Sequence, residues 1–116
     1  PFSLAELAAR VRALSRRAAG ARAPRVRAGE AEIDLAARKA HRDGTEVELS
    51  AKEFELLEWL TLHAGRAVPV EELLEHLFPD AASGAAVVRV YVGQLRRKLG
   101  RDAIATVPGG YRLGSP

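Results

Sequence analysis

A basic stretch near the C-terminus carries the residue types best suited to binding an anionic partner. Residues 87–100 read VVRVYVGQLRRKLG, with four basic side chains and no acidic one. Guanidinium groups pair with phosphates, while guanidinium or amide forks and small apolar groups contact the edges of DNA bases. This stretch could therefore hold and read a polyanion if its polar side chains share one exposed face.

The stretch has the periodicity of an amphipathic helix, because its apolar residues recur at spacings of three and four. The face expected to be buried consists of Val88, Val92, Leu95 and Leu99. On the opposite face, Gly93 either lets a DNA backbone approach closely or is only a mild helix defect costing up to about 1 kcal/mol. That exposed face comprises Val87, Arg89, Val90, Gly93, Gln94, Arg96 and Arg97.

Charge is distributed unevenly along the 116 residues, whose formal net charge is +3. Residues 1–29 contain seven basic residues and one acidic residue, residues 30–85 five and thirteen, and residues 86–116 six and one. A basic end on an acidic middle predicts an anionic partner for the C-terminal third. Hydrophobic residues make up 47% of the chain, enough for one modest core.

Composition disfavours several classes of function. The chain has no cysteine, which excludes disulfides and thiolate metal sites and fits a cytoplasmic protein. No apolar run approaches the ~18 residues of a membrane span, so we expect a soluble chain without a membrane partner. Three scattered histidines, His41, His63 and His76, do not predict a metal site. Ser3 and Ser50 are expected to cap helices, which leaves no candidate nucleophile, so we expect neither an enzyme nor a cofactor.

Local signals predict the other elements. Residues 31–49 alternate around an Asp43-Gly44 hairpin turn and predict a small antiparallel sheet. Ser50 and Glu53 form a capping box, which predicts a helix ended by Gly65. Its buried face is expected to comprise Phe54, Leu57, Leu60 and Ala64. A short helix over residues 70–78 and a terminal hairpin around residues 108–110 complete the pattern.

The N-terminal segment is predicted to be separate from this body. Ser3 and Glu6 make another capping box, so residues 1–17 are expected to form a helix, and residues 18–24 a linker. The apolar stripe of this helix has nothing nearby in the sequence to cover it, so the helix looks like the end of a larger unit. That stripe comprises Leu4, Leu7, Val11 and Leu14.

In this order, the segments resemble the OmpR/PhoB family of bacterial response regulators. The matching segments are SAKEFELL at 50–57, GRAV at 65–68, VVRVYV at 87–92, LRRKL at 95–99, IATV at 104–107 and GYRL at 110–113. The resemblance implies an α+β winged helix-turn-helix over residues 25–116, with an N-terminal four-stranded antiparallel sheet, three helices and a C-terminal β-hairpin wing. Residues 1–17 resemble the last helix of the receiver domain of that family.

The resemblance also implies the function of an effector domain that binds double-stranded DNA and regulates transcription. The residues placed to read bases would be Val87, Arg89, Val90 and Gln94. Those near the DNA backbone would be Arg66, Tyr91, Arg96, Arg97, Tyr111 and Arg112. Tyr91 could equally pack on the body of the domain.

This sequence departs from the family pattern at positions that bear on DNA recognition. Arg89 replaces a usual acidic residue and Tyr91 a usual histidine, so the recognised sequence is expected to differ from that of other members. The wing turn is one residue shorter than usual and lacks its arginine, which argues against insertion of the wing tip into the minor groove. Phe78 replaces a usual tryptophan, and Pro69 stands at a usual N-cap serine, so the second helix is expected to lack a side-chain cap.

Further partners are implied only by the resemblance. The loop at residues 79–85 matches the segment through which relatives contact RNA polymerase. A sensor histidine kinase would act on the receiver domain, through which the full-length protein would form a homodimer on tandem half-sites. The matching positions of the receiver dimer face are Glu6, Arg10, Arg12 and Arg17.

Two other binding functions remain open from the sequence. A winged helix could bind protein through the acidic face of residues 53–75. RNA binding is disfavoured because the exposed aromatic platform expected for single strands is missing. The salt dependence of binding separates DNA recognition from protein recognition, since phosphate contacts release counterions.

Overall fold

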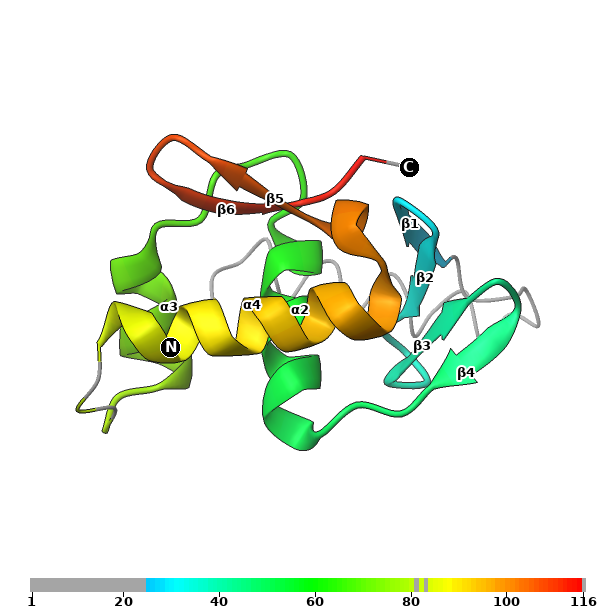
Figure 1. Cartoon of the computed structure of the whole chain (residues 1–116), viewed down its shortest axis with the longest axis horizontal. Helices are drawn as coiled ribbons and strands as arrows, with labels where there is room; N and C mark the ends of the chain where they lie inside the picture. The colour runs from blue at the N-terminus through cyan, green and yellow to red at the C-terminus, as the bar shows by residue number, and fades with distance from the viewer. Residues whose placement is uncertain (1–24, 81, 83, 116) are drawn as a thin grey trace.

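The computed structural model describes residues 25–80, 82 and 84–115, arranged as a sheet, three helices and a hairpin (Figure 1). This α+β order confirms the winged helix expected from the sequence. The expected helix at residues 1–17 and linker at 18–24 lie outside the described residues. The elements are β1 (Val26–Ala28), β2 (Ala31–Asp34), β3 (Lys39–Arg42), β4 (Thr45–Val47), α2 (Ala51–Leu62), α3 (Val70–Leu77), α4 (Ala85–Leu99), η1 (Arg101–Ala103), β5 (Ile104–Val107) and β6 (Gly110–Leu113).

The first sheet is antiparallel with strand order β1-β2-β3-β4. Its last hairpin turns at Asp43-Gly44, as expected, and both residues have positive φ angles, 53° and 77°, as a two-residue type I′ turn requires. One face of the sheet covers the core through Ala28, Ala31, Ile33 and Ala40, all fully buried.

Helix α2 starts at the expected capping box. The Glu53 backbone N–H donates to Ser50 Oγ at 3.2 Å, and the Ser50 N–H donates to Glu53 Oε1 at 2.7 Å. The helix ends at Leu62, earlier than expected, so Ala64 is exposed and does not belong to the buried face. The His63 N–H still donates to the Trp59 carbonyl, but the chain then turns through Gly65 at a φ of 90°.

Replacing Ser50 with alanine is expected to lower the free energy of unfolding by about 1 kcal/mol, because the Glu53 N–H loses its side-chain acceptor. Urea unfolding followed by circular dichroism measures the change. Ser115→Ala is the control, since that exposed serine caps no helix and should leave stability unchanged. If the Ser50→Ala variant is as stable as the wild type, the capping box does not stabilise α2.

Helices α3 and α4 pack with α2 into the second half of the core. Pro69 precedes α3 and provides no side-chain cap, as expected. Helix α4 crosses in front of α2 (Figure 1). Its predicted buried face is confirmed, since Val88, Val92, Leu95 and Leu99 are each at most 1% exposed.

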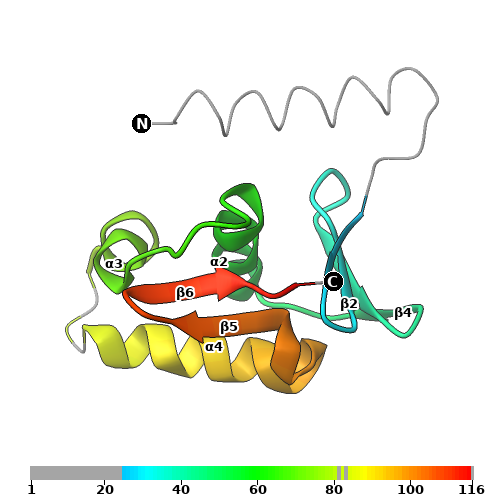
Figure 2. The same cartoon turned by 90° about the horizontal axis from the view of Figure 1, so that it is seen from above.

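The wing, β5 and β6, is attached both along one strand and at its base. Along β6, the Val68 N–H donates to the Tyr111 carbonyl at 2.7 Å and the Tyr111 N–H to the Val68 carbonyl at 3.0 Å. At the base, the Gly114 N–H donates to the Ala103 carbonyl at 2.7 Å. Figure 2 shows the two strands beside α4, with the C-terminus next to the first sheet. The wing is therefore part of the body of the domain.

Candidate nucleic-acid interface

The face of α4 that points away from α2 carries most of the expected base-reading residues. Arg89 and Val90 are exposed, and Val90 reaches 54% exposure, unusual for a large apolar residue. Gln94 is half-buried on the same face. Val87 packs partly against the core, which limits how far its side chain can extend outward.

The lysine and arginine side chains of residues 25–80 form ion pairs or hydrogen bonds within the domain. On the sheet, Arg42 contacts Glu30 at 3.0 Å and Lys39 contacts Glu46 at 3.3 Å. On α2, Lys52 donates to the Leu77 carbonyl at 2.7 Å. The remaining pairs are Arg25 and Arg27 with Glu32, Arg38 with Glu58, and Arg66 with Glu72. Positive charge in residues 25–80 is thus locally neutralised.

The described arginines that form no side-chain hydrogen bond or ion pair within residues 25–80, 82 and 84–115 gather in the C-terminal third. Arg89 and Arg97 lie on the exposed face of α4, Arg101 follows directly in η1, and Arg112 lies on β6. Sequence reasoning missed Arg101, although its position just after the basic end of the helix was a usable signal. These four unpaired arginines, Arg89, Arg97, Arg101 and Arg112, form the cationic set of the site.

Two arginines expected near the DNA backbone have partners within the domain. Both terminal nitrogens of Arg66 donate to the Glu72 carboxylate, at 3.2 and 2.8 Å. Arg96 donates to the Ile104 carbonyl and the Thr106 hydroxyl of β5. The structure therefore does not leave either guanidinium free for a phosphate.

The Arg66–Glu72 pair also changes a protonation equilibrium. Hydrogen bonds from the Arg66 guanidinium hold the pKa of the Glu72 carboxyl below its ordinary value, against the opposing effect of burial. The Trp59 indole N–H, which donates to Glu72 Oε2 at 2.8 Å, acts in the same direction. The Glu72 carboxylate on α3 therefore links this helix to α2, through Trp59, and to the α2–α3 connection, through Arg66.

Both tyrosines expected near the backbone pack inside the domain. The Tyr91 ring lies 5.1 Å from the Phe78 ring and is partly buried, which favours the packing alternative for Tyr91. Tyr111 is only 8% exposed and belongs to the core, so little of its side chain is available for the expected contact with the DNA backbone. It shares a strand face with buried Leu113, whereas Arg112 between them points to the other face.

Gly93 has open space around it, since an added Cβ would meet only Arg97 Nη1, at 3.7 Å. Replacing Gly93 with alanine is therefore expected to raise the free energy of unfolding by up to about 1 kcal/mol. Thermal unfolding measures that gain. A loss of DNA affinity in the stabilised variant would identify close approach as the role of Gly93, and unchanged affinity would identify a helix defect. A destabilised variant would contradict the open geometry.

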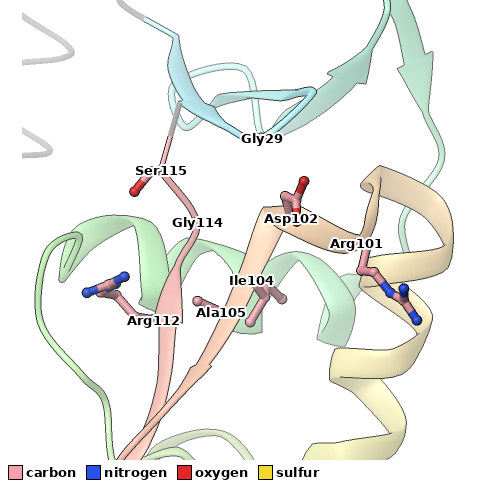
Figure 3. Close-up of a pocket in the computed structure, with 8 residues that line it drawn as sticks. All are labelled: Gly29, Arg101, Asp102, Ile104, Ala105, Arg112, Gly114 and Ser115. Carbon is pink, nitrogen blue, oxygen red and sulfur yellow. The ribbon is translucent and has the colours of Figure 1, made fainter.

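An open pocket of about 430 Å³ lies between the base of the wing and the β1–β2 turn. Its lining residues include Gly29, Asp102, Arg101 and Arg112. The two arginines point away from each other (Figure 3). Because their cationic groups do not converge, the pocket offers no cradle for a small anion.

Membrane insertion and metal binding find no support in the described residues. None of the helices in the described part of the chain is long and apolar enough to cross a membrane. Histidine and acidic side chains in residues 25–80, 82 and 84–115 form no cluster of three or more that could hold a metal ion.

Curated relatives match nearly the whole chain. Transcriptional regulatory protein CutR of Streptomyces coelicolor is 45% identical over 97% of this chain and 54% of its own length. Transcriptional regulatory protein QseB of Escherichia coli O157:H7 is 44% identical over 98% and 53%. The chain thus spans about half the length of these relatives.

Solved structures match the fold as well. Response regulator DrrB, an OmpR/PhoB homologue from Thermotoga maritima, has a TM-score of 0.72 and 29% identity over 99% of this chain and 54% of its own. The DNA-binding domain of Klebsiella pneumoniae RstA in complex with the RstA box has a TM-score of 0.63 and 28% identity over 78% and 96%. The family model for the C-terminal part of transcriptional regulatory proteins matches residues 44–113. The chain belongs to the winged-helix DNA-binding output domains of OmpR/PhoB-type response regulators.

Proposed function

We propose that the domain binds double-stranded DNA in a sequence-specific manner, with α4 in the major groove. The observation that carries this proposal is the gathering of the unpaired arginines on α4, η1 and β6 while cations elsewhere are paired. A major groove admits one α-helix, and an exposed helix face with cationic ends suits that place. The RstA domain, which has the same fold, was solved with a DNA box.

The contacts divide by side-chain chemistry. Arg89 and Gln94 carry donor forks that can bind base edges, and exposed Val90 suits a thymine methyl group. Val87 packs partly against the core, so only the exposed part of its side chain could contact a base. Arg97, Arg101 and Arg112 would neutralise phosphates and fix the register of the domain on DNA.

Within the whole protein, the domain would be the output of a two-component system in the cytoplasm. A receiver domain, of which residues 1–17 would be the last helix, would pair two copies on tandem half-sites and accept a phosphoryl group from a sensor kinase. Glu6, Arg10, Arg12 and Arg17 would lie on the pairing face. The loop at residues 79–85 would contact RNA polymerase. Family membership supports these proposals.

The proposal is tested by selecting duplexes from a random pool with residues 25–116 and titrating the selected duplex against salt. Three phosphate contacts predict that the logarithm of the binding constant falls with the logarithm of salt at a slope of about −3. Binding that does not weaken as salt rises would refute phosphate contact. It would favour the protein-binding alternative.

Replacing Arg89 and Gln94 together with alanine is expected to relax base preference at the positions under α4. Each good bidentate hydrogen-bonded contact with a base contributes about 1–3 kcal/mol of discrimination against the wrong base. Competition between selected and scrambled duplexes at fixed salt measures the loss. Arg42→Ala, which removes a cation already paired with Glu30, is the control and should leave preference unchanged. Retained preference in the double variant would place base reading elsewhere.

A further inference from the structure

We infer that Arg96 is a positioning residue, which fixes the wing relative to the exposed face of α4 and does not bind a phosphate. The inference rests on the proposed function, because it assigns Arg96 a role within DNA binding. Its basis is the set of hydrogen bonds from the Arg96 guanidinium to β5.

The guanidinium fork of Arg96 binds two acceptors on the same strand. Nε and Nη2 both donate to the Ile104 carbonyl oxygen, at 3.1 and 2.8 Å, and Nη2 also donates to Thr106 Oγ1 at 2.8 Å. Such charge-assisted bonds are stronger than neutral ones, and the planar fork fixes the direction of the strand as well as its distance. Arg96 is half-buried, as its place between helix and strand requires.

This contact holds β5, the strand of the wing that does not bridge to the α2–α3 connection. At the base, Ile104 and Leu113 are buried, whereas Thr106, nearer the tip, is exposed. The Val68–Tyr111 bridge holds β6 to the α2–α3 connection. Arg96 instead holds β5, and it does so from the helix that carries Arg89 and Gln94.

The consequence is a fixed spacing between two DNA-contacting parts before DNA arrives. Arg112 on the wing and the base-reading face of α4 then meet the duplex as one unit. Binding does not have to order the wing, and groups that are already ordered lose less entropy on binding. Loosening the Arg96 contact should therefore weaken the wing contribution and leave base reading by α4 intact.

The experiment uses two duplexes selected by the wild-type domain. One includes the flank that the wing covers, located by hydroxyl-radical footprinting, and the other is shortened to remove it. The variants are Arg96→Lys, which keeps the charge but not the fork, and Thr106→Val, which removes one acceptor from an exposed strand position. Arg42→Lys is the matched control, since Nε and Nη2 of Arg42 also donate to one acceptor, Glu30 Oε2, on the first sheet and outside the DNA-binding set.

Wild type should bind the long duplex about tenfold more tightly than the short one, the difference being the phosphate contacts of the wing. Arg96→Lys should reduce that ratio to about twofold while its affinity for the short duplex stays within twofold of wild type. Thr106→Val should reduce the ratio less, because the Ile104 carbonyl remains. Arg42→Lys should keep the wild-type ratio. Without DNA, amides of residues 104–113 should exchange hydrogen faster in Arg96→Lys than in Arg42→Lys.

Three results would overturn the inference. The first is that wild type binds the long and the short duplex equally tightly. The second is that Arg96→Lys keeps the wild-type ratio of affinities for the two duplexes. The third is an equal loss of affinity for both duplexes, which marks a phosphate contact. Failure of the proposed function looks different, because the wild-type domain would then bind neither duplex in a salt-dependent way.

Discussion

The Gly110→Ala variant is expected to lose about 3 kcal/mol of unfolding free energy, because its methyl group has no room. A Cβ at this position would collide with the Val68 carbonyl oxygen and lie 3.0 Å from Pro69 Cα. Both obstacles are backbone atoms, so no flexible side chain can move aside. The wing must then move away from the α2–α3 connection, which breaks the Val68–Tyr111 bridge. Denaturant unfolding measures the loss, and duplex titration should show weaker binding.

Gly109→Ala is the matched control for that variant. Gly109 has a φ of 91°, but nothing lies within 4 Å of an added Cβ, so only backbone strain of about 1 kcal/mol is expected. Equal losses in the two variants would mean that strain in the turn, and not the close approach to Val68, explains the requirement for glycine.

Lys98→Met should lower stability at neutral pH by about 2 kcal/mol, since it leaves a buried carboxylate without its counter-ion. Lys98 Nζ donates to Glu53 Oε1 at 2.7 Å, and the Glu53 side chain is only 4% exposed. Lys98 itself is 40% exposed, so the effect falls below the ~3–5 kcal/mol of fully buried pairs. Urea unfolding at several pH values measures both size and pH dependence.

The pH dependence follows from the direction of the pKa shift at Glu53. Burial opposes ionisation, but hydrogen bonds from Lys98 and the Ser50 backbone outweigh it and hold the pKa of Glu53 below its ordinary value. Its stabilising effect is therefore present above the pKa of the unfolded chain and lost as the pH falls through the folded-state pKa. The difference between Lys98→Met and wild type should narrow toward about pH 4, where protonation removes the uncompensated charge.

Lys39→Met serves as the control for the charge deletion. Lys39 and its partner Glu46 are both more than half exposed, and such pairs contribute little, so a change below about 0.5 kcal/mol is expected. If Lys98→Met behaves like Lys39→Met, or if its deficit stays constant with pH, the Glu53–Lys98 pair does not stabilise the domain as described.

Features that depend on neighbouring residues in the chain were predictable from the sequence. The buried face of α4 follows from spacing alone, because residues three and four apart share a side of any helix. The Ser50–Glu53 box and the Asp43-Gly44 turn are likewise settled within four residues. The end of α2 was less predictable, since Gly65 lies in the turn beyond the helix and not at its cap.

Partners of long side chains could not be predicted in the same way. A periodic pattern shows that Arg96 leaves the core, but not that its guanidinium reaches back to a carbonyl on β5. Likewise, Arg66 meets Glu72 only after the chain turns from α2 to α3. The burial of Tyr111 had an available signal, because alternation places it with Leu113 and opposite Arg112. The sequence therefore predicts which face of an element is exposed better than it predicts which charged side chains lack a partner within the domain.

The pairing of cations in residues 25–80 has a kinetic consequence. With Arg25, Arg38 and Arg66 neutralised locally, the unpaired arginines of the described domain lie on α4, η1 and β6, so its positive charge is unevenly distributed. The field of a nearby duplex then exerts a torque that turns α4 toward the phosphates before contact. Fewer collisions occur in unproductive orientations, and association becomes faster at low ionic strength. Carboxylates far from the interface thus help to set the rate at which it forms.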